Sequence, residues 1–174
     1  MTKVFMTNKS ALSLIAKAEK IFTDFPHLPK SLTEFFVKIT PWGVGLGAFF
    51  SAMGVITNLK LGLGTGSIGR AMNIYIGINP IYFLLTAVLQ IILIVIAFKA
   101  FNLLRNRKIE GWIYLFWSNA ISLAEYALTL IFLGGSAFSL LIGALIGYYL
   151  LFEMKPFYEV DKVKKTSKTK AKKN

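Results

Sequence analysis

Polar side chains inside long apolar stretches are the residues of this chain best placed to do chemistry. Glu125 lies in the apolar stretch 112–133, with Ser122 on its helical face. Asn119 lies beside that face, and Gln90 lies in the preceding apolar stretch. Polar and ionisable groups at membrane depth mark either ion pathways or contacts between helices. These four residues are the candidate intramembrane polar site.

The spacing of two stretches places Gln90 near Glu125. If 78–104 and 112–133 form antiparallel helices, residues whose numbers sum to about 213 lie level with one another. Gln90 then lies within one turn of Glu125, and we expect a hydrogen bond between their side chains. A single carboxylate without a second acid or broken helices is a poor transport pathway. We therefore favour a polar contact that joins two helices over a proton or cation site.

Residues for most enzyme chemistry are missing. The chain has no cysteine, and its one histidine is His27, between two prolines. Cysteine-ligated metals are therefore excluded, and neither a paired-histidine metal site nor a Ser-His triad can be built inside the membrane. Gly64-x-Gly66-x-x-Gly69 matches a dinucleotide fingerprint, but it follows an apolar span and has no room for a βαβ unit. We expect no enzymatic activity, no cofactor and no metal.

The elements that position these residues follow from apolar length. Of 174 residues 55% are hydrophobic and only 16% are charged. Stretches of about 20 apolar residues can cross the hydrocarbon core of a bilayer. The chain contains four of them, at residues 41–59, 78–104, 112–133 and 137–154. This pattern predicts an all-α integral membrane protein, with a bundle over residues 41–154 whose four transmembrane helices form two antiparallel hairpins.

Orientation follows from the basic residues. Of the 20 Lys and Arg residues, only Lys60 and Arg70 fall between the first two spans, and none falls between the last two. Cytoplasmic segments of membrane proteins carry the excess of Lys and Arg. We therefore expect a multi-pass protein of the cell membrane with both termini in the cytoplasm. The Lys-rich tail 155–174 is expected to be disordered and drawn to anionic headgroups. It lacks interleaved aromatics beyond Tyr158, so no specific nucleic acid is expected as partner.

Residues 1–40 predict a pair of short cytoplasmic helices. Residues 9–25 have amphipathic spacing. Ser31 and Glu34 form a capping box for a second helix, and Thr40 is expected to cap a membrane helix that begins at Pro41. We expect the pair to lie in the membrane interface; the alternatives are that they cover the cytoplasmic end of the bundle or bind a partner.

Small residues recur every four positions in the first and last spans, which lets helix backbones approach closely. These helix-packing candidates are Gly43, Gly47, Ser51, Ser139, Gly143 and Gly147. We favour packing within one chain; the alternative is contact with a second copy or another membrane protein.

Basic and aromatic residues at the cytoplasmic ends of the spans are expected to bind membrane lipids, above all anionic headgroups. These expected anchors are Trp42, Lys99, Arg105, Arg107, Lys108, Trp112 and Lys155.

Three segments carry a resemblance. Pro41-Trp42 opens a span, a basic connection precedes Gly111-Trp112, and the last span ends in the sequence GYYLLFEMKPFY at 147–158. Over about residues 31–158 the chain resembles a group of small four-helix bacterial membrane proteins with no assigned activity. The resemblance implies the same topology and a bacterial cell membrane, and it assigns no functional residue.

The function expected from these features is a non-enzymatic interaction or scaffold protein of the membrane. The alternative is a small channel, a holin-like pore or a proton or cation transporter that uses Glu125 and Gln90.

Overall fold

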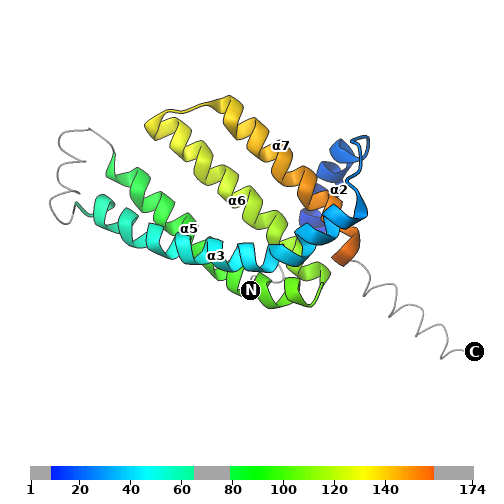
Figure 1. Ribbon diagram of the computed structural model, residues 1–174. Coiled ribbons are helices and arrows are strands. Elements are labelled where there is room, and N and C mark those ends of the chain that lie inside the picture. Colours follow the sequence, from blue (N-terminus) through cyan, green and yellow to red (C-terminus); the bar gives the residue numbers. More distant parts are fainter. Residues whose placement is uncertain (1–8, 65–78, 159–174) are drawn as a thin grey trace, which may run out of the picture.

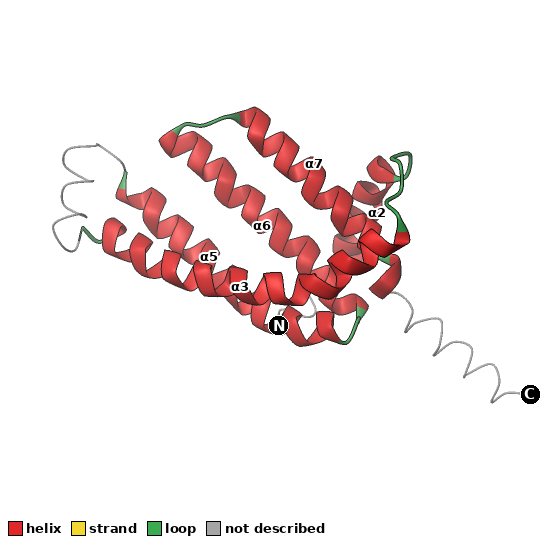
Figure 2. Cartoon of the chain, viewed as in Figure 1, coloured by secondary structure: helices red, strands yellow, loops and turns green. Residues whose placement is uncertain are grey.

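The computed structural model describes residues 9–64 and 79–158 (Figure 1). Every regular element within these ranges is a helix (Figure 2). The helices are α2 (Lys9–Phe22), α3 (Lys30–Gly62), α5 (Pro80–Arg105), α6 (Ile109–Leu133) and α7 (Ala137–Met154). The predictions for the glycine-rich loop at 65–78 and for the tail from residue 159 onward lie outside the described residues.

Four of these helices, α3, α5, α6 and α7, are long and apolar enough to cross a membrane. The shortest is α7, whose 18 residues extend about 27 Å at 1.5 Å per residue. The predicted all-helical class with four membrane-compatible helices is confirmed.

The first of them, α3, is longer than the sequence indicated. It runs unbroken through Pro41, so the predicted separate helix after Ser31 is part of the same 33-residue element. Thr40 does not cap a helix start; its hydroxyl donates to the carbonyl of Phe36 at 2.7 Å, within the helix. No side chain caps the first turn of α3, so the predicted capping box is absent. The helix persists through the proline because Val37 and Pro41 are both buried.

Helices that follow one another in the chain pack as neighbours. α3 lies along α5, α5 along α6 and α6 along α7 (Figure 1). α3 has much less contact with α7, and part of it is near the start of α3, where the hydroxyl of Thr40 lies 3.5 Å from the sulfur of Met154. We call this end the base; it holds the start of α3, the α5–α6 connection and the end of α7.

The buried core sits at the base. Val37, Leu104, Trp112 and Phe152 come from four different helices and belong to one cluster. Ile15 of α2 joins that cluster, and α2 contacts α7. Part of the apolar face of α2 therefore covers the end of the bundle, as the alternative interpretation held, whereas Leu12, Leu14 and Ile21 are exposed. The location of α2 in the membrane interface stays a prediction.

The α5–α6 connection at the base is unusually tight. Arg107 takes a left-handed φ of 51°. Gly111, in the first turn of α6, lies against the end of α5: a Cβ there would be 2.8 Å from the backbone nitrogen of Leu104 and 2.9 Å from the carbonyl carbon of Leu103. Only glycine fits this position without displacing backbone.

Candidate functional site

A ladder of side-chain hydrogen bonds joins α3, α5 and α6. Asn58 Nδ2 donates to Gln90 Oε1 at 3.1 Å, and Gln90 Nε2 donates to Glu125 Oε1 at 2.8 Å. The hydrogen bond predicted between Gln90 and Glu125 is therefore present. Gly54 of α3 makes room for it, because a Cβ at that position would lie 2.9 Å from Gln90 Oε1.

The ladder continues toward the end of the bundle opposite the base. The hydroxyl of Thr129 donates to the backbone carbonyl of Glu125 at 3.1 Å. Its oxygen is then free to accept from the hydroxyl of Tyr82, also 3.1 Å away. Five polar residues, Asn58, Gln90, Glu125, Thr129 and Tyr82, are thus connected by hydrogen bonds between three helices, through the backbone carbonyl of Glu125 at the step to Thr129.

The chemistry open to the ladder is limited. Glu125 is its one carboxylate, and Oε2 of that residue makes no hydrogen bond to a described residue. Within residues 9–64 and 79–158, no three His, Asp or Glu side chains come together as a metal site would require. The arrangement can bind a proton or join helices, and it has no nucleophile with an adjacent base.

The other predicted polar residues do not join the ladder. Asn119 and Ser122 line a groove of about 600 Å³ between α3, α6 and α7, and Ser118, which was not predicted, lines it with them. We call this the α3–α7 groove. Asn119 hydrogen-bonds to none of the described residues, and its carboxamide lies against Gly147. The structure therefore separates the predicted site into a hydrogen-bonded pair, Gln90 and Glu125, and two residues on the groove, Asn119 and Ser122.

Most of the predicted packing glycines are open. Among the described residues, an alanine-sized side chain at Gly43, Gly47 or Gly143 would meet no atom within 4 Å, so the favoured packing within the chain does not hold for these three glycines. α3 instead approaches α5 at other glycines. These glycines and their contacts are Gly45 against Phe101, Gly54 against Gln90 and Gly62 against Leu84. Of the predicted glycines in the last span, only Gly147 has a close neighbour among the described residues, Asn119. Ser139 is exposed near the start of α7, and Ser51 on α3 is half-buried.

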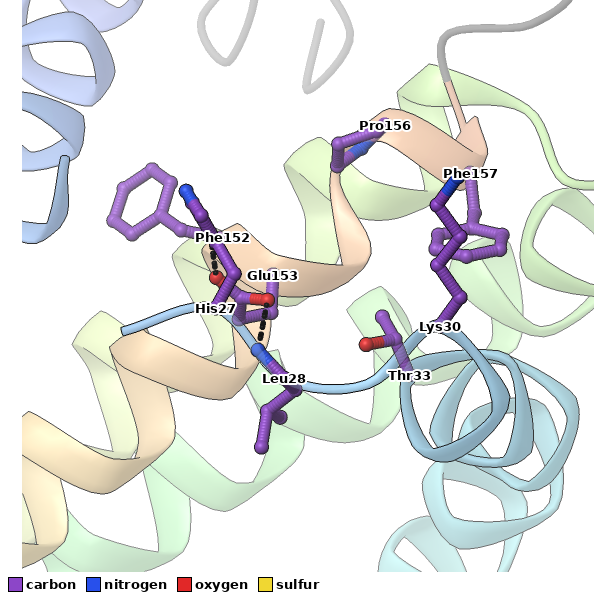
Figure 3. Close-up of a pocket in the computed structure, with 8 residues that line it drawn as sticks. All are labelled: His27, Leu28, Lys30, Thr33, Phe152, Glu153, Pro156 and Phe157. Carbon is purple, nitrogen blue, oxygen red and sulfur yellow. Dashed lines mark hydrogen bonds and ion pairs between the residues drawn. The ribbon is translucent and has the colours of Figure 1, made fainter. Parts of the chain in front are cut away.

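The segment between α2 and α3 is tied to the end of α7 by Glu153. Its Oε1 lies 2.7 Å from Nδ1 of His27, and its Oε2 accepts from the backbone N–H of Leu28 at 3.0 Å (Figure 3). The hydroxyl of Tyr149 donates to the carbonyl of Pro26. A hollow of about 600 Å³ lies beside these groups. His27, expected to be a plain loop residue, thus helps to hold the loop, though at 77% exposure its ion pair contributes little.

Two predicted lipid anchors have protein partners instead. Trp112 is only 1% exposed, and its indole N–H donates to the carbonyl of Leu151 at 2.7 Å, so the anchor prediction for it is wrong. Nζ of Lys155 lies 2.7 Å from both carboxylate oxygens of Glu19 and 5.7 Å from the Trp112 ring. These contacts fasten α2 to the end of α7. Sequence reasoning missed them because the pairing of Glu19 with Lys155 spans nearly the whole chain.

The remaining predicted anchors lie on the surface. Trp42 is exposed, and the guanidinium of Arg105 lies 5.8 Å from its ring. Arg107 pairs with Glu34 at 3.5 Å. Lys99 and Lys108 have exposed side chains.

Comparison of the chain with family models, curated proteins and solved structures finds no match. The resemblance to small bacterial membrane proteins therefore stays a prediction, and the functional argument rests on the geometry of the chain itself.

Proposed function

We propose that this chain is a multi-pass protein of a bacterial cell membrane whose role is to bind the transmembrane helix of a partner, without catalysis. Four membrane-compatible helices support the membrane location. The basic residues of the sequence support a cytoplasmic base and cytoplasmic termini. In that orientation α3 with α5 and α6 with α7 form the two antiparallel hairpins.

The observation that carries the proposal is the carboxamide of Asn119 in the α3–α7 groove. It has no hydrogen-bond partner among the described residues, although it lies on a helix at membrane depth. Lipid tails cannot satisfy an amide, so an exposed one is costly in a bilayer. A partner that brings a polar group into the groove removes this cost.

The shape of the groove favours a helix as the occupant. Gly43 lines one wall, and the open glycine Gly47 lies one turn further along α3. Small residues with this spacing let a second helix approach closely, which is how helices associate where the hydrophobic effect between them is absent. Ser118 and Ser122 on the opposite wall add hydrogen-bonding groups.

The test replaces Asn119 by leucine and measures two properties. We expect the size of the complex extracted from native membranes in mild detergent to fall toward that of the monomer. The thermal stability of the purified chain should stay equal or rise, because the substitution removes an unsatisfied amide. Ala124→Leu is the matched control, since Ala124 is exposed on the same helix but does not line the groove. An unchanged complex in Asn119→Leu would contradict the proposal.

One observation favours a second candidate, a proton or cation channel or transporter. Oε2 of Glu125 makes no hydrogen bond to a described residue, so it could bind a proton while Oε1 stays fixed by Gln90. The test is proton and cation flux in proteoliposomes for the native chain and for Glu125→Gln at equal reconstitution. Flux that is lost in the variant would support transport, and equal leak in both would leave Glu125 as a residue that joins helices.

A further inference from the structure

A second groove lies between α3 and α5, on a different face from the α3–α7 groove. Its volume is about 450 Å³. Small residues of both helices line it: Gly45, Ala48, Ala52 and Ala97. Phe49 and Phe98 also line it, and they are 60% and 74% exposed. The result is an apolar groove between the two helices, flanked by exposed aromatic side chains.

The end of this groove nearest the base carries a positive charge. Phe101 and Asn102 line that end, and Arg105 follows Phe101 by one helical turn. The guanidinium carbon of Arg105 lies 5.8 Å from the ring centres of both Phe101 and Trp42. A guanidinium held against aromatic rings keeps its N–H donors for a ligand, and their fork matches the oxygens of a phosphate.

The charge of Arg105 is not balanced by the described part of the protein. None of the described residues that line the groove is acidic, and no described carboxylate lies within ion-pair distance of Arg105. The nearby Arg107 differs, because it pairs with Glu34 at 3.5 Å. A ligand that complements this surface carries an anion at one end and hydrocarbon at the other.

We infer that α3 and α5 bind one anionic phospholipid, with its phosphate on Arg105 and one acyl chain in the groove. The inference rests on the proposed membrane orientation, which places the base at the cytoplasmic headgroups. From Asn102 to Ile94 the groove extends about 12 Å along α5 toward the middle of the bilayer. An acyl chain below a headgroup at Arg105 runs in the same direction. The anionic lipids of the cytoplasmic leaflet supply the ligand.

The experiment is native mass spectrometry of the full chain in detergent, titrated with dioleoyl phosphatidylglycerol or with dioleoyl phosphatidylcholine. We expect phosphatidylglycerol to bind more tightly. Arg105→Gln should weaken its binding about tenfold, which corresponds to loss of one charge-assisted contact, and should leave phosphatidylcholine unchanged. Lys30→Gln is the matched control: it removes an equal charge from the same end of the bundle, at an exposed residue outside the groove that is not one of the expected anchors, and should have little effect.

A second pair of variants tests the acyl chain. Ala52→Phe fills the groove and should weaken both lipids, whereas Ala124→Phe adds the same bulk to an exposed position outside it. Equal binding of the two lipids, or equal losses in Arg105→Gln and Lys30→Gln, would overturn the inference. A dimer in the spectra that Ala52→Phe abolishes would instead assign the groove to a second copy of the chain.

Failure of this inference is distinguishable from failure of the proposed topology. Alkaline carbonate releases a peripheral chain from membranes and leaves an integral one. A chain released by carbonate would refute the membrane orientation and the lipid site with it. A chain that stays in the membrane but binds both lipids equally would refute the lipid site alone.

Discussion

Replacing Gly111 by alanine is expected to destabilise the protein, although alanine is the better helix former. The added Cβ would lie 2.8 Å from the backbone nitrogen of Leu104 and 2.9 Å from the carbonyl carbon of Leu103. Overpacking costs about 1–3 kcal/mol, and the upper end applies because backbone atoms cannot rotate away. Alanine regains about 1 kcal/mol of helix propensity. The net loss in the free energy of unfolding is therefore about 2 kcal/mol.

The matched control is Gly143→Ala, where the new Cβ meets nothing within 4 Å. Gly143→Ala should gain the same helix propensity without a steric clash, so the free energies of unfolding of the two variants should differ by about 3 kcal/mol. The assay is thermal unfolding in detergent, followed by the loss of the monomer peak in size-exclusion chromatography. For a chain of this size 1 kcal/mol shifts Tm by about 2–4 °C, so Gly111→Ala should lower Tm by about 4–8 °C. A Tm equal to that of Gly143→Ala would refute the close packing of the α5–α6 connection.

Two further predictions concern the base. Trp112→Phe should lower the free energy of unfolding by about 1–3 kcal/mol in the same thermal assay. The substitution removes the indole N–H from the carbonyl of Leu151, and the backbone amide of Lys155 cannot replace it because that amide bonds to Phe152. A smaller loss than in the exposed control Trp42→Phe would count against this role. Burial raises the pKa of Tyr158 to about 12 from 10.0, so the unfolded chain releases this proton first and stability should fall as pH rises from about 10 to 12, by at most about 2.7 kcal/mol. Tyr158→Phe should remove that part of the pH dependence, and an identical alkaline loss of Tm in the variant would contradict the assignment.

The helices could be predicted because their signal is local. Apolar length identifies a membrane-compatible helix without knowledge of its neighbours, and all four were found. The Gln90–Glu125 bond was predictable for a related reason, since a short connection fixes which residues of two antiparallel helices lie level. The start of α3 was not, because Pro41 is normally read as a first helical position. Burial of Val37 and Pro41 at the base, a tertiary effect, carries the helix through it.

The rest of the site depended on how the helices are rotated, which one sequence does not reveal. Asn58 joins the ladder only because α3 presents it to Gln90. Gly43 and Gly143 have the spacing of packing residues, yet α3 turns a different set of glycines toward α5. Trp112 is of a residue type common at the membrane interface, but it is buried because side chains of other helices, including the end of α7, pack against it at the base. A tryptophan at the end of an apolar stretch indicates a preference for the membrane interface, but the sequence does not show whether other side chains bury that tryptophan.

The central claim is that a partner helix occupies the α3–α7 groove in the membrane. The most direct measurement places a photocrosslinking amino acid at Gly43, inside the groove, and in a second variant at Ala124, outside it. Both are irradiated in intact cells, with and without Asn119→Leu. We predict one protein adduct of defined mass at Gly43 that Asn119→Leu diminishes, and none at Ala124. Labelling of lipid alone at both positions would contradict the claim.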